Sequence, residues 1–284
     1  MNLTKLKDDL YVPEDFENNH YYFADPEGKK KYTGITSVIG VLAKPALIGW
    51  AARMATEYAS AHIESGKTYT EDELASIFES AKSAHQKKKE AAGEHGTSVH
   101  ALVEEYIGLC LSEIEGRPLS VVPEHKGEPI QKFIDWAVEN VDRFLFTERR
   151  MSNKDLFVAG TADFGCVMKD GKRLIGDLKT SSGVYGIDYF LQCAGYKILA
   201  EAEGDEPYDG CVIVRLGKKG PEDFDVTYRY AEPSTTESST DLWQRLARFL
   251  GNKKAKINYS DIDTKAFLAC LTLYRAQATY VKPK

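Results

Sequence analysis

Hydrophobic residues recur every three or four positions through most of the first half of the chain, which is the period of an amphipathic helix. On this pattern helices are predicted over about 45–63, 70–92, 96 onward and 127–140. Pro45 is a favoured first-turn residue and marks the start of the first of them. Ahead of these helices, the aromatic run at 21–23 and the turn residues at 25–28 predict a short hairpin.

From Phe144 the pattern changes to short apolar runs bounded by turn residues, which is typical of strands. Strands are predicted near 144–146, 156–158, 164–168, 173–175, 210–216 and 224–230, with a helix over about 187–202 and a helical tail over about 235–284. No repeat, low-complexity segment or linker interrupts the pattern. We therefore predict one α/β domain over 1–284, with a helical N-terminal part at about 36–140 and a sheet core at about 142–231.

Composition narrows the classes of function. The 284 residues include 43 acidic and 37 basic side chains, for a net charge of -6, which excludes a histone-like basic protein. A polyanionic partner would have to be held by a local basic patch or through metal ions. The first residues lack an apolar core of signal-peptide length, and no apolar run approaches membrane-spanning length. We expect a soluble, cytoplasmic protein without membrane contact.

The 5 cysteines have no close pair and no CxxC spacing, so they indicate neither a disulfide framework nor a zinc or iron–sulfur site. We expect buried, small apolar side chains at Cys110, Cys166, Cys193, Cys211 and Cys270.

Three charged residues in the strand region carry the candidate chemistry. Asp177 and Lys179 share one face of a predicted strand, because alternate residues do so. A three-residue loop with Gly171 in the left-handed conformation would set Asp163 opposite Asp177, with Cβ atoms about 5 Å apart. A two-residue turn at Asp170 and Gly171 would instead place the two acids on opposite faces. The sequence permits both turns.

Two carboxylates and a lysine on one face suit metal-assisted hydrolysis of a phosphodiester. The acids would hold one or two Mg²⁺ or Mn²⁺ ions, which prefer oxygen ligands, and the metal would activate a water. Lys179 could orient that water or stabilise the transition state. In isolation an Asp-x-Lys tripeptide more often marks a solvated ion pair, so the context matters. His100 could supply a nitrogen ligand, and Gln192 and Tyr196 lie four residues apart on one helical face.

Four parts of the sequence resemble, in order and spacing, the motifs of the PD-(D/E)XK nuclease superfamily. They are His100, the Gly-Thr-Ala-Asp at 160–163, the Asp-Leu-Lys at 177–179 and the segment 192–196. The similarity is to its RecB-like branch, which includes phage-encoded exonucleases and the mitochondrial genome maintenance exonuclease, and runs from about residue 20 to 231. It implies a restriction-endonuclease-like mixed sheet flanked by helices. It also implies a DNA partner that is single-stranded or has free ends, and the host cytoplasm if the protein is phage-encoded.

The resemblance also assigns roles to single residues. The implied metal ligands are His100, Asp163, Asp177 and the Leu178 carbonyl. Lys179 would be the catalytic lysine, and Gln192 and Tyr196 would contact the DNA strand near the scissile phosphate. Asp177 stands where the superfamily more commonly has Glu, and its shorter arm would shift the metal spacing. The four-cysteine cluster of some relatives is missing, so no iron–sulfur cluster is expected.

The sequence allows two interpretations of several other charged residues. Glu148 occupies a place where RecB-like proteins often have an acid, yet an exposed strand charge fits equally. Glu104 is either an outer carboxylate of the site or a solvated helix acid. Basic runs either grip a phosphate backbone or face water, and they lie at Lys87, Lys88 and Lys89 and at Lys29, Lys30 and Lys31.

The leading hypothesis is a Mg²⁺- or Mn²⁺-dependent DNA exonuclease. A structure-specific endonuclease and a catalytically silent nucleic-acid-binding module on the same fold are the alternatives. The sequence has no glycine-rich motif of a nucleotide hydrolase or of a dinucleotide-binding protein between a predicted strand and a predicted helix. Nucleotide hydrolysis and hydride transfer are therefore not expected.

Overall fold

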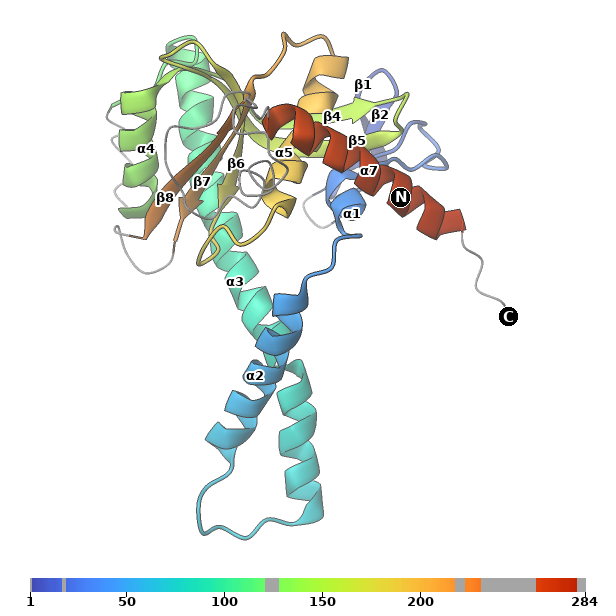
Figure 1. Ribbon diagram of the computed structural model, residues 1–284, viewed down its shortest axis with the longest axis vertical. Helices are drawn as coiled ribbons and strands as arrows, with labels where there is room; N and C mark the ends of the chain where they lie inside the picture. The colour runs from blue at the N-terminus through green and yellow to red at the C-terminus, as the bar shows by residue number, and fades with distance from the viewer. Residues whose placement is uncertain (1, 17–18, 121–127, 218–222, 231–258, 280–284) are drawn as a thin grey trace, which may run out of the picture. The chain divides into compact units, whose positions relative to one another are not determined.

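The computed structural model describes residues 2–16, 19–120, 128–217, 223–230 and 259–279 (Figure 1). The chain divides into two compact units. One is Leu42–Val99, called here the helical unit, and the other combines Met1–Val41 with His100–Lys284 and is called the sheet unit. Among the described helices, none combines the length and the apolar character needed to cross a membrane.

The helical unit consists of α2 (Pro45–His62) and the first part of α3 (Glu71–Glu113). A capping box starts α3, since the Glu73 N–H donates to Thr70 Oγ1 at 3.3 Å while the Thr70 N–H donates to the Glu73 carboxylate at 2.8 Å. The separate helices predicted over 70–92 and from 96 are in fact one helix of 43 residues. A glycine inside a helix costs only about 1 kcal/mol relative to Ala, so Gly93 and Gly96 do not end it.

A mixed sheet forms the centre of the sheet unit. Its strands are β3 (Thr33–Gly34), β4 (Val141–Asn153), β5 (Val158–Met168), β6 (Arg173–Lys179), β7 (Gly210–Leu216) and β8 (Phe224–Tyr230). The order is β3-β5-β6-β7-β8, with β4 paired to β5. The β3–β5 and β6–β7 pairs are parallel, and the others are antiparallel. Helix α5 (Asp188–Ala202) makes the crossover between the parallel β6 and β7.

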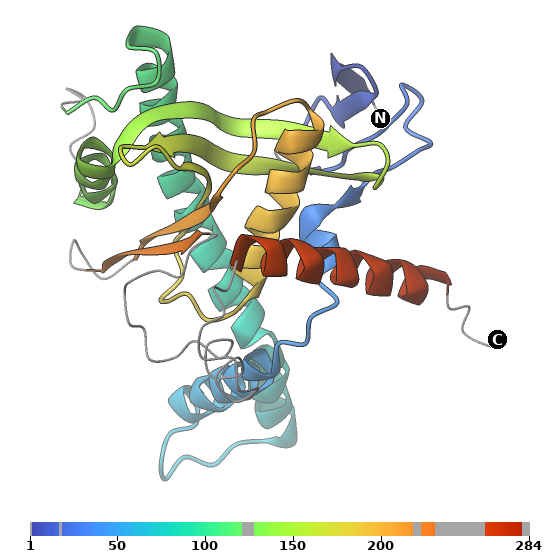
Figure 2. The ribbon, with the colours of Figure 1, turned by 45° about the horizontal axis from the view of Figure 1, so that its top comes forward.

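Helices cover both faces of this sheet, as Figure 2 shows. In α4 (Glu128–Asn140), Trp136 Nε1 donates to the Tyr228 hydroxyl at 2.7 Å. Arg229, the next residue of β8, pairs with Asp263 of α7 (Tyr259–Thr279) at 2.9 Å. Consecutive strand residues point to opposite faces, so α4 and α7 lie on opposite sides. The predicted α/β fold with a mixed sheet flanked by helices is therefore confirmed.

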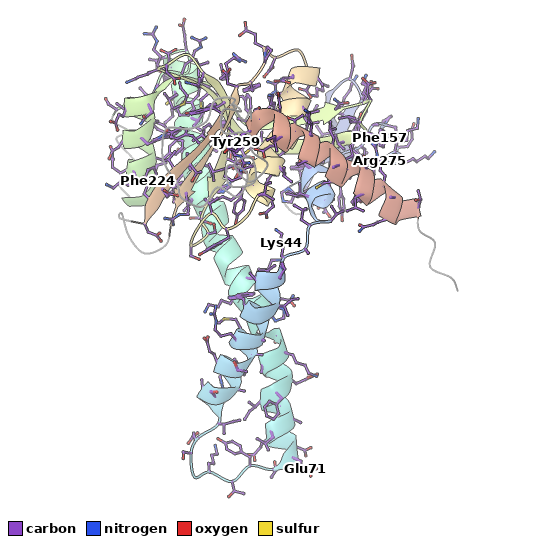
Figure 3. All side chains as sticks on the ribbon, in the orientation of Figure 1. Lys44, Glu71, Phe157, Phe224, Tyr259 and Arg275 are labelled. Atoms are coloured by element: carbon purple, nitrogen blue, oxygen red, sulfur yellow. The ribbon has the colours of Figure 1, made fainter. Side chains whose placement is uncertain are left out.

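Aromatic packing holds α4 and the end of α3 against the sheet. The Phe133 ring lies 6.1 Å from the ring of Phe144 and 5.9 Å from that of Phe164, and Tyr106 of α3 lies 6.0 Å from Phe133. All four side chains are buried. At the far end of α7, Arg275 donates to the Leu156 carbonyl in the turn between β4 and β5 (Figure 3).

The N-terminal segment has its own small core. It contains β1 (Leu3–Lys7), β2 (Leu10–Pro13) and the short helix α1 (Ile35–Ile39). The predicted hairpin is confirmed, because the Tyr32 N–H donates to the Tyr22 carbonyl and the Ala24 N–H to the Lys30 carbonyl, both at 2.8 Å. The buried residues of the cluster are Leu10, Val12, Phe16, Tyr22, Tyr32 and, from β5, Ala159.

The remaining elements agree with expectation in most places. All five cysteines are free and buried, as predicted. Helix α7 falls within the predicted helical tail, whose part at 235–258 lies outside the described residues. The run at 156–158 is mainly the turn before β5 rather than a strand.

Candidate metal centre

The turn between β5 and β6 decides whether the two aspartates can meet. Met168 donates its N–H to the Lys172 carbonyl at 2.8 Å, which closes a three-residue loop, and Gly171 has a φ of +87°. The strands then pair Phe164 with Gly176. One step further along this register, Asp163 stands opposite Asp177. Of the two turns that the sequence permits, the structure therefore has the one that the metal-site hypothesis requires.

Asp163 sits where β5 and β6 part. The antiparallel pairing ends at Phe164 and Gly176, while β6 continues beside β7 as far as Lys179. The Leu178 N–H has no strand partner on this edge and donates to Asp163 Oδ2 at 2.7 Å, because a buried backbone donor needs an acceptor. The N–H and C=O of a strand residue project toward the same edge. The Leu178 carbonyl is thus expected on the Asp163 side as well.

A second acid and a histidine join Asp163. Ligand atoms of His100, Glu148 and Asp163 all lie within 4.8 Å of one another, and His100 Nδ1 is 3.9 Å from Asp163 Oδ2. The three residues come from α3, β4 and β5. Pairing of Thr147 with Phe164 and of Arg149 with Ala162 places Glu148 opposite Asp163. One imidazole nitrogen and two carboxylates form a donor set that can hold a divalent cation.

The backbone and the charge at Glu148 are both unusual. Its φ of +43° lies in the left-handed region, which costs a non-glycine residue about 1–3 kcal/mol and is found most often at functional sites. Burial, followed by the charges of Asp163 and Glu104, raises the pKa of Glu148 to about 8. A cation bound between these carboxylates would favour the charged form of Glu148 and so lower its pKa again.

Asp177 and Lys179 form a buried ion pair beside this group. Lys179 Nζ is 2.5 Å from Asp177 Oδ2, and Asp177 is 0% exposed. Burial raises the pKa of Asp177 and the charge of Asp163 raises it further, although Lys179 opposes both. Lys179 is the partner of Oδ2, whereas within the described part of the chain Asp177 Oδ1 has no hydrogen-bond partner. The carboxylate therefore keeps lone pairs that a cation could take.

The lysine remains charged in this setting. Burial alone would lower the pKa of Lys179, but the carboxylates of Asp177 and Asp163 outweigh burial and raise it above its ordinary value. Its side chain is 18% exposed and its Nζ lies 5.3 Å from the ring centroid of Tyr189. Lys179 thus offers a fixed positive charge rather than a proton acceptor.

A cavity of about 410 Å³ opens at the metal-binding group, and all of its lining residues belong to the sheet unit. Of the predicted site residues, it brings together His100, Asp163 and Tyr196, with Glu148 beside them. Tyr196 is buried and accepts a hydrogen bond from Gln192 Nε2 at 2.8 Å. Gln192 therefore supports the wall from behind and is not among the residues that line the cavity.

The other predicted residues lie outside that wall. Asp177, Leu178 and Lys179 do not line the cavity as described, although Asp163 contacts the Leu178 N–H and affects the charge state of the other two. Lys87, Lys88 and Lys89 are exposed on α3 within the helical unit, which contributes no residue to the cavity.

Two parts of the site do not follow from the sequence alone. Glu148 fits a site acid and an exposed strand charge equally well in the sequence, whereas the structure has its side chain half-buried in the cavity wall. Only the register of β4 against β5 selects the first of these interpretations. The N-terminal segment also contributes to the cavity wall, and its signal in the sequence is the aromatic run at 21–23 close to a basic run at 29–31.

No protein-family model matches this chain, and a search of curated proteins finds no match to it. The resemblance to the nuclease superfamily therefore depends on the motifs and on the geometry described above.

Proposed function

We propose that this chain is a metal-dependent deoxyribonuclease of the PD-(D/E)XK superfamily that hydrolyses DNA from free or single-stranded ends. The observation that carries the proposal is the convergence of His100, Glu148 and Asp163 within 4.8 Å beside the buried pair of Asp177 and Lys179. Carboxylates with raised pKa values that gather at a cavity with a histidine and a lysine are typical of functional sites.

The order of the strands supports a restriction-endonuclease-like fold. Three consecutive antiparallel strands, β4, β5 and β6, are followed by the crossover helix α5 and the parallel strand β7. The candidate ligands lie where the pairing of β5 and β6 ends, beside the cavity of about 410 Å³. This architecture agrees with the RecB-like resemblance of the motifs.

Each group of the site has a distinct task in the proposed reaction. When bound, Mg²⁺ or Mn²⁺ lowers the pKa of water and neutralises charge on the phosphate. His100, Glu148 and Asp163 would hold the ion, with Asp177 and the Leu178 carbonyl beside them. Because its pKa is raised, Lys179 stays protonated and stabilises negative charge on the phosphate oxygens, and it does not act as the general base.

The test is incubation of the purified protein with end-labelled linear single strands, blunt duplexes and circular single strands, in Mn²⁺ or in EDTA. We expect linear DNA to be degraded in Mn²⁺ alone, while circles stay intact. Asp163→Asn and Lys179→Met should each lower the rate by at least about 100-fold, which is the usual loss when one electrostatic stabiliser is removed.

The matched control is Asp142→Asn, an acid of the same sheet whose side chain is 50% exposed. It should cleave at the rate of the wild type, and circular dichroism should show that every variant is folded. Cleavage of circles would favour the structure-specific endonuclease. A folded protein that leaves every form of DNA intact in Mn²⁺ would overturn the proposal in favour of a silent binding module.

A further inference from the structure

The cavity beside the metal-binding group has a second wall of a different chemical character. Besides His100, Glu148 and Asp163, its lining includes residues of the N-terminal segment, among them Phe16, Tyr21, Tyr22 and Lys31. Sites of about 300–1,000 Å³ hold drug-sized ligands, so about 410 Å³ fits one nucleotide and excludes a base pair with both its backbones.

An exposed aromatic ring and an amine form the outer part of this wall. Tyr21 is 42% exposed, and Lys31 Nζ lies 3.4 Å from the centroid of its ring. Within the described part of the chain, no carboxylate pairs with Lys31. Aromatic faces stack on nucleobases regardless of the base, and an ammonium group binds phosphate. Since Lys31 covers one face of the Tyr21 ring, a base stacks on the other face, and the two groups together match an unpaired nucleotide.

The wall is rigid before any ligand arrives. The Tyr22 hydroxyl lies 2.7 Å from Thr161 Oγ1 of β5, and the Tyr22 ring packs 5.3 Å from that of Phe16. The guanidinium carbon of Arg150 lies 4.4 Å from the centroid of the Phe16 ring. Tyr22 and Phe16 are both buried, so the chain that carries Tyr21 is fixed to the sheet. A platform fixed in this way costs little entropy when it binds a ligand.

We propose that this cavity is a subsite for one unpaired nucleotide of a DNA strand, whose base stacks on Tyr21 and whose backbone phosphate contacts Lys31. The subsite deepens the proposed nuclease function and rests on it. It selects single strands and frayed ends, because a base held in a pair cannot reach the Tyr21 ring. Lys31 and Tyr21 are then specificity-determining residues, outside the metal-binding group.

The binding experiment uses a short fluorescein-labelled oligothymidylate in Ca²⁺, with fluorescence anisotropy as the readout. Tyr21→Ala should weaken binding by about 5- to 100-fold, as expected for the loss of one stacked base, while Tyr21→Phe should stay within about 2-fold of the wild type. Lys31→Ala should weaken binding and lower the salt slope by about 0.7. Lys29→Ala is the matched control, since it changes an exposed lysine of the same hairpin that does not line the cavity.

A second readout separates this subsite from the nuclease proposal. Hydrolysis of bis-para-nitrophenyl phosphate, a diester without a base, should be unchanged in Tyr21→Ala, whereas KM for single-stranded DNA rises. Unchanged DNA binding by Tyr21→Ala, or a wild type that does not bind single strands, overturns the subsite. Weakened binding by Tyr21→Ala in a protein that never cleaves DNA supports the subsite and overturns only the nuclease proposal.

Discussion

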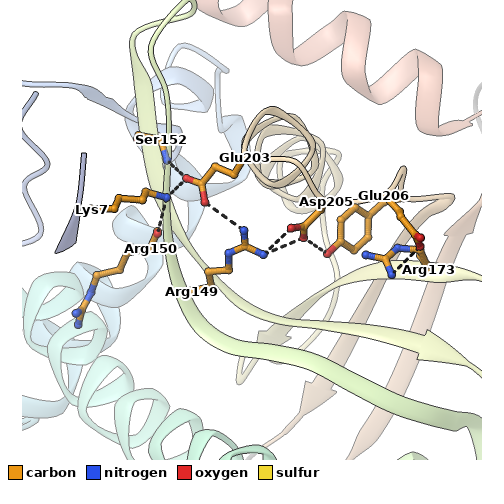
Figure 4. Close-up of polar contacts among 9 residues, drawn as sticks. Lys7, Arg149, Arg150, Ser152, Arg173, Glu203, Asp205 and Glu206 are labelled. Atoms are coloured by element: carbon orange, nitrogen blue, oxygen red, sulfur yellow. Dashed lines mark hydrogen bonds and ion pairs between the residues drawn. The ribbon is translucent and has the colours of Figure 1, made fainter. Parts of the chain in front are cut away.

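Two groups of charged residues include neighbouring positions of β4. In one group each acid has a partner of opposite charge or a hydrogen-bond donor, whereas the other group has too few partners for its carboxylates. Arg149 belongs to a paired cluster with Lys7, Glu203, Asp205 and Tyr208 (Figure 4). Glu148 belongs to an acidic cluster with His100, Asp163 and Asp177. The same strand therefore carries both a satisfied and an unsatisfied arrangement of charge.

Every acid of the paired cluster has a partner. Arg149 donates to both oxygens of Asp205 at 2.9 Å and to Glu203 at 3.2 Å, and the Tyr208 hydroxyl donates to Asp205 at 2.7 Å. The Ser152 N–H donates to Glu203 at 2.8 Å. This cluster links β4 to the segment that follows α5, and its role is structural.

The acidic cluster lacks that balance. Burial and neighbouring carboxylates raise the pKa of both Glu148 and Asp177, and among described residues Asp177 Oδ1 accepts no hydrogen bond, while Oδ2 pairs with Lys179. Buried carboxylates without enough partners lower the stability of the folded protein. A bound cation would neutralise them and offset this cost. The comparison shows that missing partners, rather than the number of charges, distinguish the proposed metal site from the paired cluster.

The largest effect is expected when the paired cluster loses its arginine. Arg149→Met would leave Glu203 and Asp205 half-buried without their main partner, so the free energy of unfolding should fall by about 3 kcal/mol. Urea denaturation measures this change. Arg143→Met, on the same strand with a side chain 51% exposed, should change stability by less than about 0.5 kcal/mol. Equal losses in the two variants would show that the paired cluster is not structural.

Metal ions should stabilise the protein through the acidic cluster. A cation at 100 times its Kd adds about 2.7 kcal/mol, so Mn²⁺ should raise the Tm of EDTA-treated protein by about 5–10 °C. Differential scanning fluorimetry measures the shift. Asp163→Asn should abolish it, while Asp142→Asn should keep it in full. A shift that survives Asp163→Asn would place the bound cation elsewhere.

The smallest effect is a change in pH dependence at Glu148. Its pKa is about 8 in the folded protein against an ordinary 4.5, so between these values only the folded state holds the proton. The stability of the wild type should therefore fall as pH rises through this window in EDTA. Glu148→Gln has no proton to lose. We expect its free energy of unfolding, relative to that of the wild type, to rise by about 1 kcal/mol between pH 5 and pH 8, a figure that allows for the screening of a half-buried charge by solvent. Parallel pH profiles would contradict the raised pKa.

Local sequence was enough to predict most elements of the fold. Helices α2, α4 and α5 and strands β7 and β8 lie close to their predicted ranges, because each has a clear period or a clear turn at its ends. The continuity of α3 was not predictable, since Gly93 and Gly96 resemble helix ends although a helix tolerates each at a cost of about 1 kcal/mol. Strands β1 and β2 were missed because they have only 5 and 4 residues, and β1 has three polar residues.

By itself the sequence determined which residue types are available for chemistry: two aspartates and a lysine on adjacent strands, with a histidine on a helix. Only the tertiary structure decided which of them meet. The turn at Gly171 and the separation of β5 from β6 place Asp163 against Leu178, and the register of β4 adds Glu148. The physical reason is that side-chain type is local, whereas the field at a carboxylate depends on neighbours that pairing brings from elsewhere in the chain.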